Sequence, residues 1–148
     1  MTLKKLLNAI GNMAIQQKCC HYSACGTSIA GLNPLSIDDY PVLFSSPTGN
    51  HRVQENTTTY EITLYWIDRL LQDNTNDIDI FSTSIEQLKN IIIGIRELDE
   101  VVGVDYNYII RNFTDTEAMN DRVAGSYSTI EITVMNDTLC FIDDTNDD

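Results

Sequence analysis

Apolar residues near the start of the chain recur at intervals of three and four positions. That spacing places them on one stripe of a helix and predicts an amphipathic helix from about Thr2 to Gln17. Lys4, Lys5 and Asn8 fall on its polar side. Gly11 weakens such a helix by roughly 1 kcal/mol relative to Ala, so packing must help to hold it. The apolar stripe consists of Leu3, Leu6, Leu7, Ile10, Met13 and Ala14.

A second stripe with the same spacing predicts another amphipathic helix in the middle of the chain. Thr83 and Glu86 have the spacing of a capping box, in which the Thr hydroxyl accepts from the backbone N–H of Glu86 and the carboxylate reaches back. The helix is therefore expected to begin near Thr83 and to end between Leu98 and Glu100. Its apolar positions are Ile85, Leu88, Ile91, Ile92, Ile95 and Leu98.

Alternation with a period of two marks the expected strands. The clearest case is Thr59–Trp66, where Tyr60, Ile62, Leu64 and Trp66 alternate with Thr59, Glu61, Thr63 and Tyr65. This is the pattern of a strand with one buried face. Shorter runs predict further strands, the last of them near the end of the chain. These runs are Tyr40–Phe44, Val104–Arg111, Ile130–Val134 and Leu139–Ile142.

The segments between these elements are rich in turn-forming residues. Cys19–Leu32 contains Gly26 and Gly31 and predicts a short hairpin followed by a loop. Ser45–Gln54 includes Pro-Thr-Gly-Asn and is expected to be a polar turn. Thr114–Arg122 is a second polar stretch between expected strands.

The order helix, strands, helix, strands lacks the regular alternation that builds a parallel sheet. It predicts an α+β fold: an antiparallel-dominated sheet with two main helices packed on one face. Residues 1–142 are expected to form a single domain, and residues 143–148 an acidic flexible C-terminal tail. A chain of 148 residues is long enough to bury one sizeable core.

The net charge of the chain limits the kinds of molecule that it can bind. The chain has 22 acidic against nine basic residues and a formal net charge of −13. Tight binding to nucleic acid is disfavoured, because proteins bind polyanions chiefly through Lys and Arg. The same charge suits a surface past which DNA must move without adhering. No apolar run approaches the ~18 residues that span a bilayer, and the first residues do not resemble a signal peptide, so we expect no membrane association.

Candidate chemistry is sparse. Cys20, His21 and Cys25, with distant Cys140 or His51, could surround a metal ion, but the spacing matches no standard zinc site. An enzymatic interpretation of the same residues makes Cys20 or Cys25 a thiol nucleophile and His21 its base. Free thiols in a turn are the simpler interpretation of these residues and of Cys19.

Other polar clusters are equally weak as functional signals. Asp73–Asp79 faintly matches a calcium-binding loop but lacks its central Gly and its bidentate Glu. Paired carboxylates such as Asp38 and Asp39 are expected in so acidic a chain. The sequence therefore supplies no catalytic, cofactor-binding or metal-binding residue.

Five segments stand out in order along the chain: the leading helix, the YPVLF segment at Tyr40–Phe44, the stretch TTTYEITLYWIDRLLQDNTNDIDI, the helix SIEQLKNIIIGIREL and the late strand VAGSYSTIEITV. Together they resemble tail-completion, or tail-terminator-like, proteins of tailed bacteriophages, and this resemblance implies a protein without catalysis or cofactors. The resemblance covers nearly the whole chain as a pattern, and none of its parts is a catalytic signature. The cysteine-rich segment Cys19–Leu32 departs most from the family.

This resemblance implies a small subunit of the head–tail connector or tail that forms a homo-oligomeric ring, six-fold or twelve-fold, in the virion. It further implies contacts with other phage neck, portal or tail proteins, assembly in the host cytoplasm, and DNA passing nearby without specific binding. Exposed strand edges and the stretches Ser45–Gln54 and Thr114–Arg122 are the expected contact regions.

Two other functions stay open on the sequence. An acidic non-virion binding or regulatory protein of the DNA-mimic type would use the −13 charge to bind a basic partner. A thiol- or metal-dependent hydrolase would use Cys20 or Cys25 with His21.

Overall fold

The computed structural model describes residues 1–32, 34–71, 73, 75–105, 108–115 and 122–137. The described chain forms two helices and one sheet of six strands, an α+β fold as predicted. The helices are α1 (Leu3–Gln16) and α2 (Asp77–Arg96), and two short 3-10 turns are η1 (Ile29–Leu32) and η2 (Ile37–Asp39). The strands are β1 (Tyr22–Cys25), β2 (Val42–Val53), β3 (Thr57–Arg69), β4 (Val101–Val104), β5 (Ile110–Asp115) and β6 (Val123–Met135).

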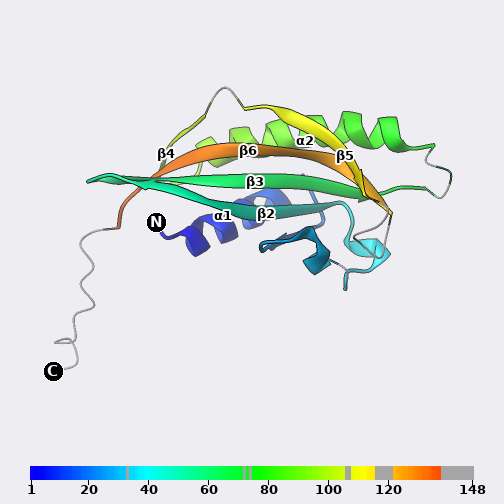
Figure 1. The fold of residues 1–148 in the computed structure, drawn as a ribbon, viewed down its shortest axis with the longest axis horizontal. Coiled ribbons are helices and arrows are strands. Elements are labelled where there is room, and N and C mark those ends of the chain that lie inside the picture. Colours follow the sequence, from blue (N-terminus) through cyan, green and yellow to red (C-terminus); the bar gives the residue numbers. More distant parts are fainter. Residues whose placement is uncertain (33, 72, 74, 106–107, 116–121, 138–148) are drawn as a thin grey trace.

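The sheet is mixed but mainly antiparallel. Its order is β1-β2-β3-β6-β4, and β5 also pairs with β6. Within the described residues, β1 and β2 run parallel and the other pairs are antiparallel. The long strands β2, β3 and β6 form its centre, while β4 and β5 share the outer side of β6 (Figure 1).

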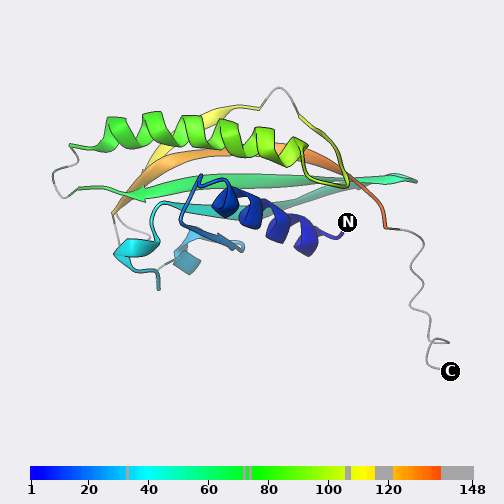
Figure 2. The same ribbon diagram turned by 180° about the vertical axis from the view of Figure 1, so that it is seen from behind.

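Both helices cover the same face of the sheet, as predicted (Figures 1 and 2). Alternate residues of β3 and β6 point toward them and form the main core with the apolar stripes of α1 and α2. Fully buried side chains of the four elements include Leu6, Ile10, Leu88, Ile91, Ile62, Leu64, Ile130 and Ile132.

The first helix begins and ends close to the predicted positions. Thr2 is its N-cap, and the Thr2 hydroxyl accepts from the backbone N–H of Lys5. Gly11 is buried where the helix crosses β1, and a Cβ there would lie 2.3 Å from the Ser23 hydroxyl. The glycine that weakens the isolated helix therefore allows this close packing against β1.

The second helix begins six residues before the predicted start at Thr83, so that prediction is wrong. Its N-cap is Asn76, and Thr83 lies exposed inside the helix. Buried Ile80 extends the apolar stripe by one turn toward the N-terminus. The stripe, rather than the capping-box spacing, decides where the helix begins. Its C-cap is Glu97, just before the predicted end.

The hairpin expected within Cys19–Leu32 is also wrong. Tyr22–Cys25 forms the single strand β1, which pairs with β2 from a distant part of the chain. The chain then folds through η1 and η2 over the sheet face opposite the helices. Leu32, Tyr40, Val42, Phe44, Ile67 and Val123 make a second, smaller core there.

The polar turn expected at Ser45–Gln54 is wrong as well, because β2 continues through this segment to Val53. The turn-forming residues lie in a bulge, where the register of β2 with β3 shifts between Pro47 and His51. Gly49 takes a φ of 92° there. Such bulges are tolerated at a sheet edge, because the extra residues need no partner on the outer side.

The single strand expected over Val104–Arg111 is two strands, β4 and β5, on the same neighbour. The predicted strand Ile130–Val134 belongs to β6, which begins at Val123 and is long enough to pair with both. The polar stretch Thr114–Arg122 starts inside β5, and residues 116–121 lie outside the described residues.

Two further predictions concern the end of the chain. The short strand at Leu139–Ile142 and the tail 143–148 lie outside the described residues. Neither described helix is both long and apolar enough to cross a membrane.

Candidate functional site: the polar face and the free edges of the sheet

The sheet face turned away from the helices is polar over half its length. Thr59, Glu61 and Thr63 of β3 alternate with the core residues of that strand. Their β6 partners in register are Thr133, Glu131 and Thr129. With Arg52 of β2, which is in register with Thr59, these residues define what we call the polar face.

Hydroxyl pairs fix the polar face across the two central strands. The Thr59 and Thr133 hydroxyls lie 2.8 Å apart, and so do those of Thr63 and Thr129. Directly opposed threonines stabilise neighbouring strands and hold their side chains in one orientation. The face is thus a pre-ordered surface.

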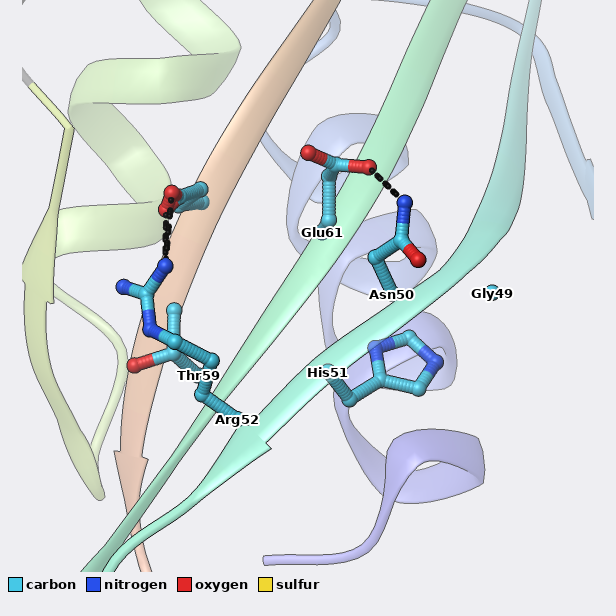
Figure 3. A pocket seen from close by; sticks show the side chains of 7 residues that line it. Gly49, Asn50, His51, Arg52, Thr59 and Glu61 are labelled. Atoms are coloured by element: carbon cyan, nitrogen blue, oxygen red, sulfur yellow. Dashed lines mark hydrogen bonds and ion pairs between the residues drawn. The ribbon is translucent and has the colours of Figure 1, made fainter.

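A shallow hollow of about 350 Å³ lies over the polar face between Glu61 and Glu131 (Figure 3). The two glutamates are directly opposed in register, and two like charges in such positions alone would destabilise the strand pair. Arg52 offsets this, because its Nη1 lies 3.1 Å from a carboxylate oxygen of Glu131. Glu61 instead accepts from the side chains of Thr48 and Asn50, the latter at 3.5 Å.

Both carboxylates of the hollow therefore already have partners from β2. Its chemistry is that of a contact surface that accepts hydrogen bonds from N–H and O–H donors. Among the residues that the structure describes, no group of three or more His, Cys, Asp or Glu side chains is placed to hold a metal ion.

The cysteines after α1 differ sharply in exposure. Cys19 and Cys20 are buried, whereas Cys25 on β1 is exposed. The indole N–H of Trp66 donates to the Cys19 carbonyl at 2.8 Å, which ties this turn to the core. Burial raises the pKa of Cys20 to about 11, and it also raises the pKa of Cys19. A nucleophilic cysteine needs a lowered pKa, so the packing works against this role for Cys20.

The other candidate metal ligands lie on different strands. Cys25 of β1 is in register with Ser45 of β2, whereas His51 lies near the opposite end of β2, with its ring 5.2 Å from that of Tyr60. Ser45 and His51 pair with residues four positions apart on β3, so roughly 13 Å of sheet separates the two candidates and they cannot share a metal. His21 is exposed and its backbone N–H donates to the Pro41 carbonyl. Cys140 lies outside the described residues.

Within the described residues, the polar side chains of the faint calcium-loop pattern bond to groups of the same turn. Asp73 accepts from both the backbone N–H and the hydroxyl of Thr75, and these bonds lower the pKa of its carboxyl. Asn76 accepts from the backbone N–H of Leu71 and donates to the carbonyl of Arg69. These contacts shape the turn that leads into α2.

The sheet also has free edges. In the described chain β1 pairs only with β2, and β5 pairs only with β6. Beyond β1, the outer side of β2 from Ser46 onward is likewise an edge. Such edges present backbone N–H and C=O groups that can pair with another chain.

Charge is distributed unevenly along the chain. The first 37 residues include Lys4, Lys5 and Lys18 and no Asp or Glu. All 22 acidic residues follow, with the other six basic ones. The start of α1, with Lys4 and Lys5, lies at the end of β6, where the Met1 amino group donates to the Met135 carbonyl and to Asp137, so these lysines do not lie on the β1 side of the sheet.

Sequence reasoning overlooked the hollow between Glu61 and Glu131. The alternation of Thr59–Trp66 already placed Glu61 on the polar side of its strand. Glu131 lies between two apolar residues, Ile130 and Ile132, so the same alternation placed it on the polar side of its strand. Arg52 could not be found this way, because its segment has the composition of a turn.

Comparison with known proteins gives no further guidance. No protein-family model matches the chain, and a search of curated proteins gives no match either.

Proposed function

We propose that this protein is a virion structural protein: a ring-forming subunit of the phage head–tail connector or tail, of the tail-completion or terminator-like kind, with no catalysis. The proposal begins from the ordered sequence resemblance described above. The α+β fold with both helices on one face is compatible with it.

One structural observation carries the proposal. Within the described residues, the main core lies on the helix-covered face, while the sheet has two edges without a paired strand and a pre-ordered polar face. A subunit that closes a ring needs two different surfaces that match each other, and the opposite edges of one sheet are such surfaces. The described residues thus supply contact area where an enzyme would supply a reactive cleft.

The acidic composition suits the same role. A net charge of −13 would let DNA pass along a channel without adhering to its wall. The partners in this proposal are further copies of the chain and neighbouring neck, portal or tail proteins. Its location is the virion, after assembly in the host cytoplasm.

The alternative is an acidic, non-virion binding or regulatory protein that mimics DNA. The excess of 22 acidic over nine basic residues favours it. The first 37 residues count against it, because they contain three lysines and no carboxylate that a basic partner could bind.

A stop codon early in the gene, carried by the phage that encodes it, separates these functions. The proposed structural role predicts that heads and tails form but do not yield complete infectious particles, and that the protein supplied from a plasmid restores them. The regulatory alternative predicts normal particles in reduced number. Finding complete, stable particles that lack this polypeptide by mass spectrometry would reject the structural role.

A further inference from the structure

β1 and β5 lie on opposite sides of the sheet and at the same height along the strand direction. Following the registers across the sheet links residues of β1 to residues of β5 in straight rows. One row is Cys25, Ser45, Leu64, Ser128 and Ile110. The other is Tyr22, Val42, Ile67, Gly125 and Phe113. A second copy placed beside the first in the plane of the sheet therefore brings β1 alongside β5.

The directions of the two edge strands also match. β1 runs parallel to β2, and three antiparallel pairings then lead through β3 and β6 to β5. β1 and β5 consequently run in opposite directions. A neighbouring copy in the same orientation would present its β1 antiparallel to β5, the arrangement used by nearly all of this sheet.

The side chains beside the two edges favour their contact. Tyr22 on β1 and Ile109 just before β5 are exposed apolar residues, 39% and 64% accessible. β1 contains no charged residue, and β5 carries one basic and one acidic residue, Arg111 and Asp115, so no like charges oppose each other along the two strands. Because the two edges differ from each other, their contact is head-to-tail and not that of a symmetric dimer.

We propose that β5 of one copy pairs antiparallel with β1 of the next, with Ile110 opposite Cys25 and Phe113 opposite Tyr22. The partner of each edge is a second copy of this chain. The contact would continue the sheet from subunit to subunit and pair backbone groups of two edges that have no strand partner among the described residues. This inference rests on the proposed ring and specifies its subunit contact.

Disulfide trapping tests the pairing, because Cys25 is already present and exposed. The test chain carries Ile110→Cys in a Cys140→Ser background, and diamide takes up the two hydrogens released as each S–S bond forms. Thiols join only if their Cα atoms come within about 7 Å. The proposed pairing predicts a ladder of covalent multimers, because each copy has one thiol at each edge.

Two matched controls identify the contact. Ile110→Cys combined with Cys25→Ser should stop at dimers or stay monomeric. Ile93→Cys places a thiol on the surface of α2, where Ile93 is 52% accessible, and it should give no ladder with Cys25. Thermal unfolding of each variant under reducing conditions confirms that it is folded before oxidation.

Native mass spectrometry of the unsubstituted chain, at high concentration and from purified particles, separates this inference from the proposed function. A closed oligomer together with the ladder supports both. A closed oligomer without the ladder overturns the β5 to β1 pairing and leaves the ring. A ladder no stronger than that of Ile93→Cys, with no oligomer in either sample, overturns the pairing, and the ring proposal then fails as well.

Discussion

The two faces of this sheet are built from alternate residues of the same strands, yet they differ in kind. On β3, Ile62 and Leu64 are fully buried beneath the helices. Their neighbours Glu61 and Thr63 belong to the polar face and bond to side chains of β2 and β6. One residue of displacement along a strand therefore separates core packing from surface chemistry. Folding stability should depend on the first set, and association with other molecules on the second.

The largest loss of stability is expected from a residue outside the helix-covered face, contrary to the division just described. Gly125 lies away from the helices, but a Cβ there would come 1.8 Å from the backbone oxygen of Trp66. We expect Gly125→Ala to cost more than about 4 kcal/mol or to prevent folding, because backbone cannot move aside as a flexible side chain does. Gly103→Ala is the matched control, since a Cβ at that position would meet nothing within 4 Å. Urea unfolding checks both, and equal stabilities would refute the close approach.

The next effect compares the two faces directly. Leu64→Ala removes a side chain with no exposed area from the main core and should lower the unfolding free energy by about 3 kcal/mol. Thr63→Ala, one residue away, removes one hydroxyl bond and should cost about 1 kcal/mol. Denaturant unfolding of both variants measures the difference. Similar losses would mean that the polar face is part of the folding core.

A smaller effect is expected at the end of the sheet, outside both faces. Asn136 donates from its amide to the carbonyls of Gln54 and Glu55, and it accepts from the buried hydroxyl of Thr58. Asn136→Ala should cost about 2 kcal/mol, because that hydroxyl loses its partner. Asn50→Ala, which removes one long exposed bond, should change stability by less than about 0.5 kcal/mol. Thermal unfolding of the two variants provides the comparison.

The smallest effect concerns pH. Burial raises the pKa of Asp68, against the opposing influence of the Arg69 backbone N–H and of His21. The fold thus favours the protonated carboxyl, and this contribution is full below the ordinary pKa of Asp and lost as pH rises through the raised value. Asp68→Asn should therefore become more stable relative to the natural chain as pH rises from about 4 to about 7, by less than about 1 kcal/mol. Urea unfolding at both pH values measures it, and a constant difference would contradict it.

Local periodicity was enough to predict the parts of the fold that depend on burial. The stripe from Leu3 to Ala14 and the alternation through Tyr60–Trp66 each identified an element and its core face. The stripe on α2 did the same, although the capping-box spacing at Thr83 placed its start too late. These patterns are reliable because the hydrophobic contact that they describe is the main source of stability.

Other parts of the fold depend on partners that are distant in sequence. β1 forms because Tyr22–Cys25 pairs with Val42–Ser45, and no local sequence pattern predicts a parallel pairing of four residues. β2 extends through Pro47 and Gly49 because a bulge at an edge absorbs them. The hollow between Glu61 and Glu131 required the register of β3 on β6. Each of these outcomes is decided by tertiary contacts rather than by propensity.

The central claim is that copies of this chain form a ring in the virion. Electron microscopy of particles purified from the organism or phage that encodes the chain, with mass analysis of the same preparation, tests that claim most directly. The account predicts density for a closed ring of this α+β subunit at the neck or tail. Complete particles in which the polypeptide is absent would contradict it, and they would direct the search toward a basic partner protein.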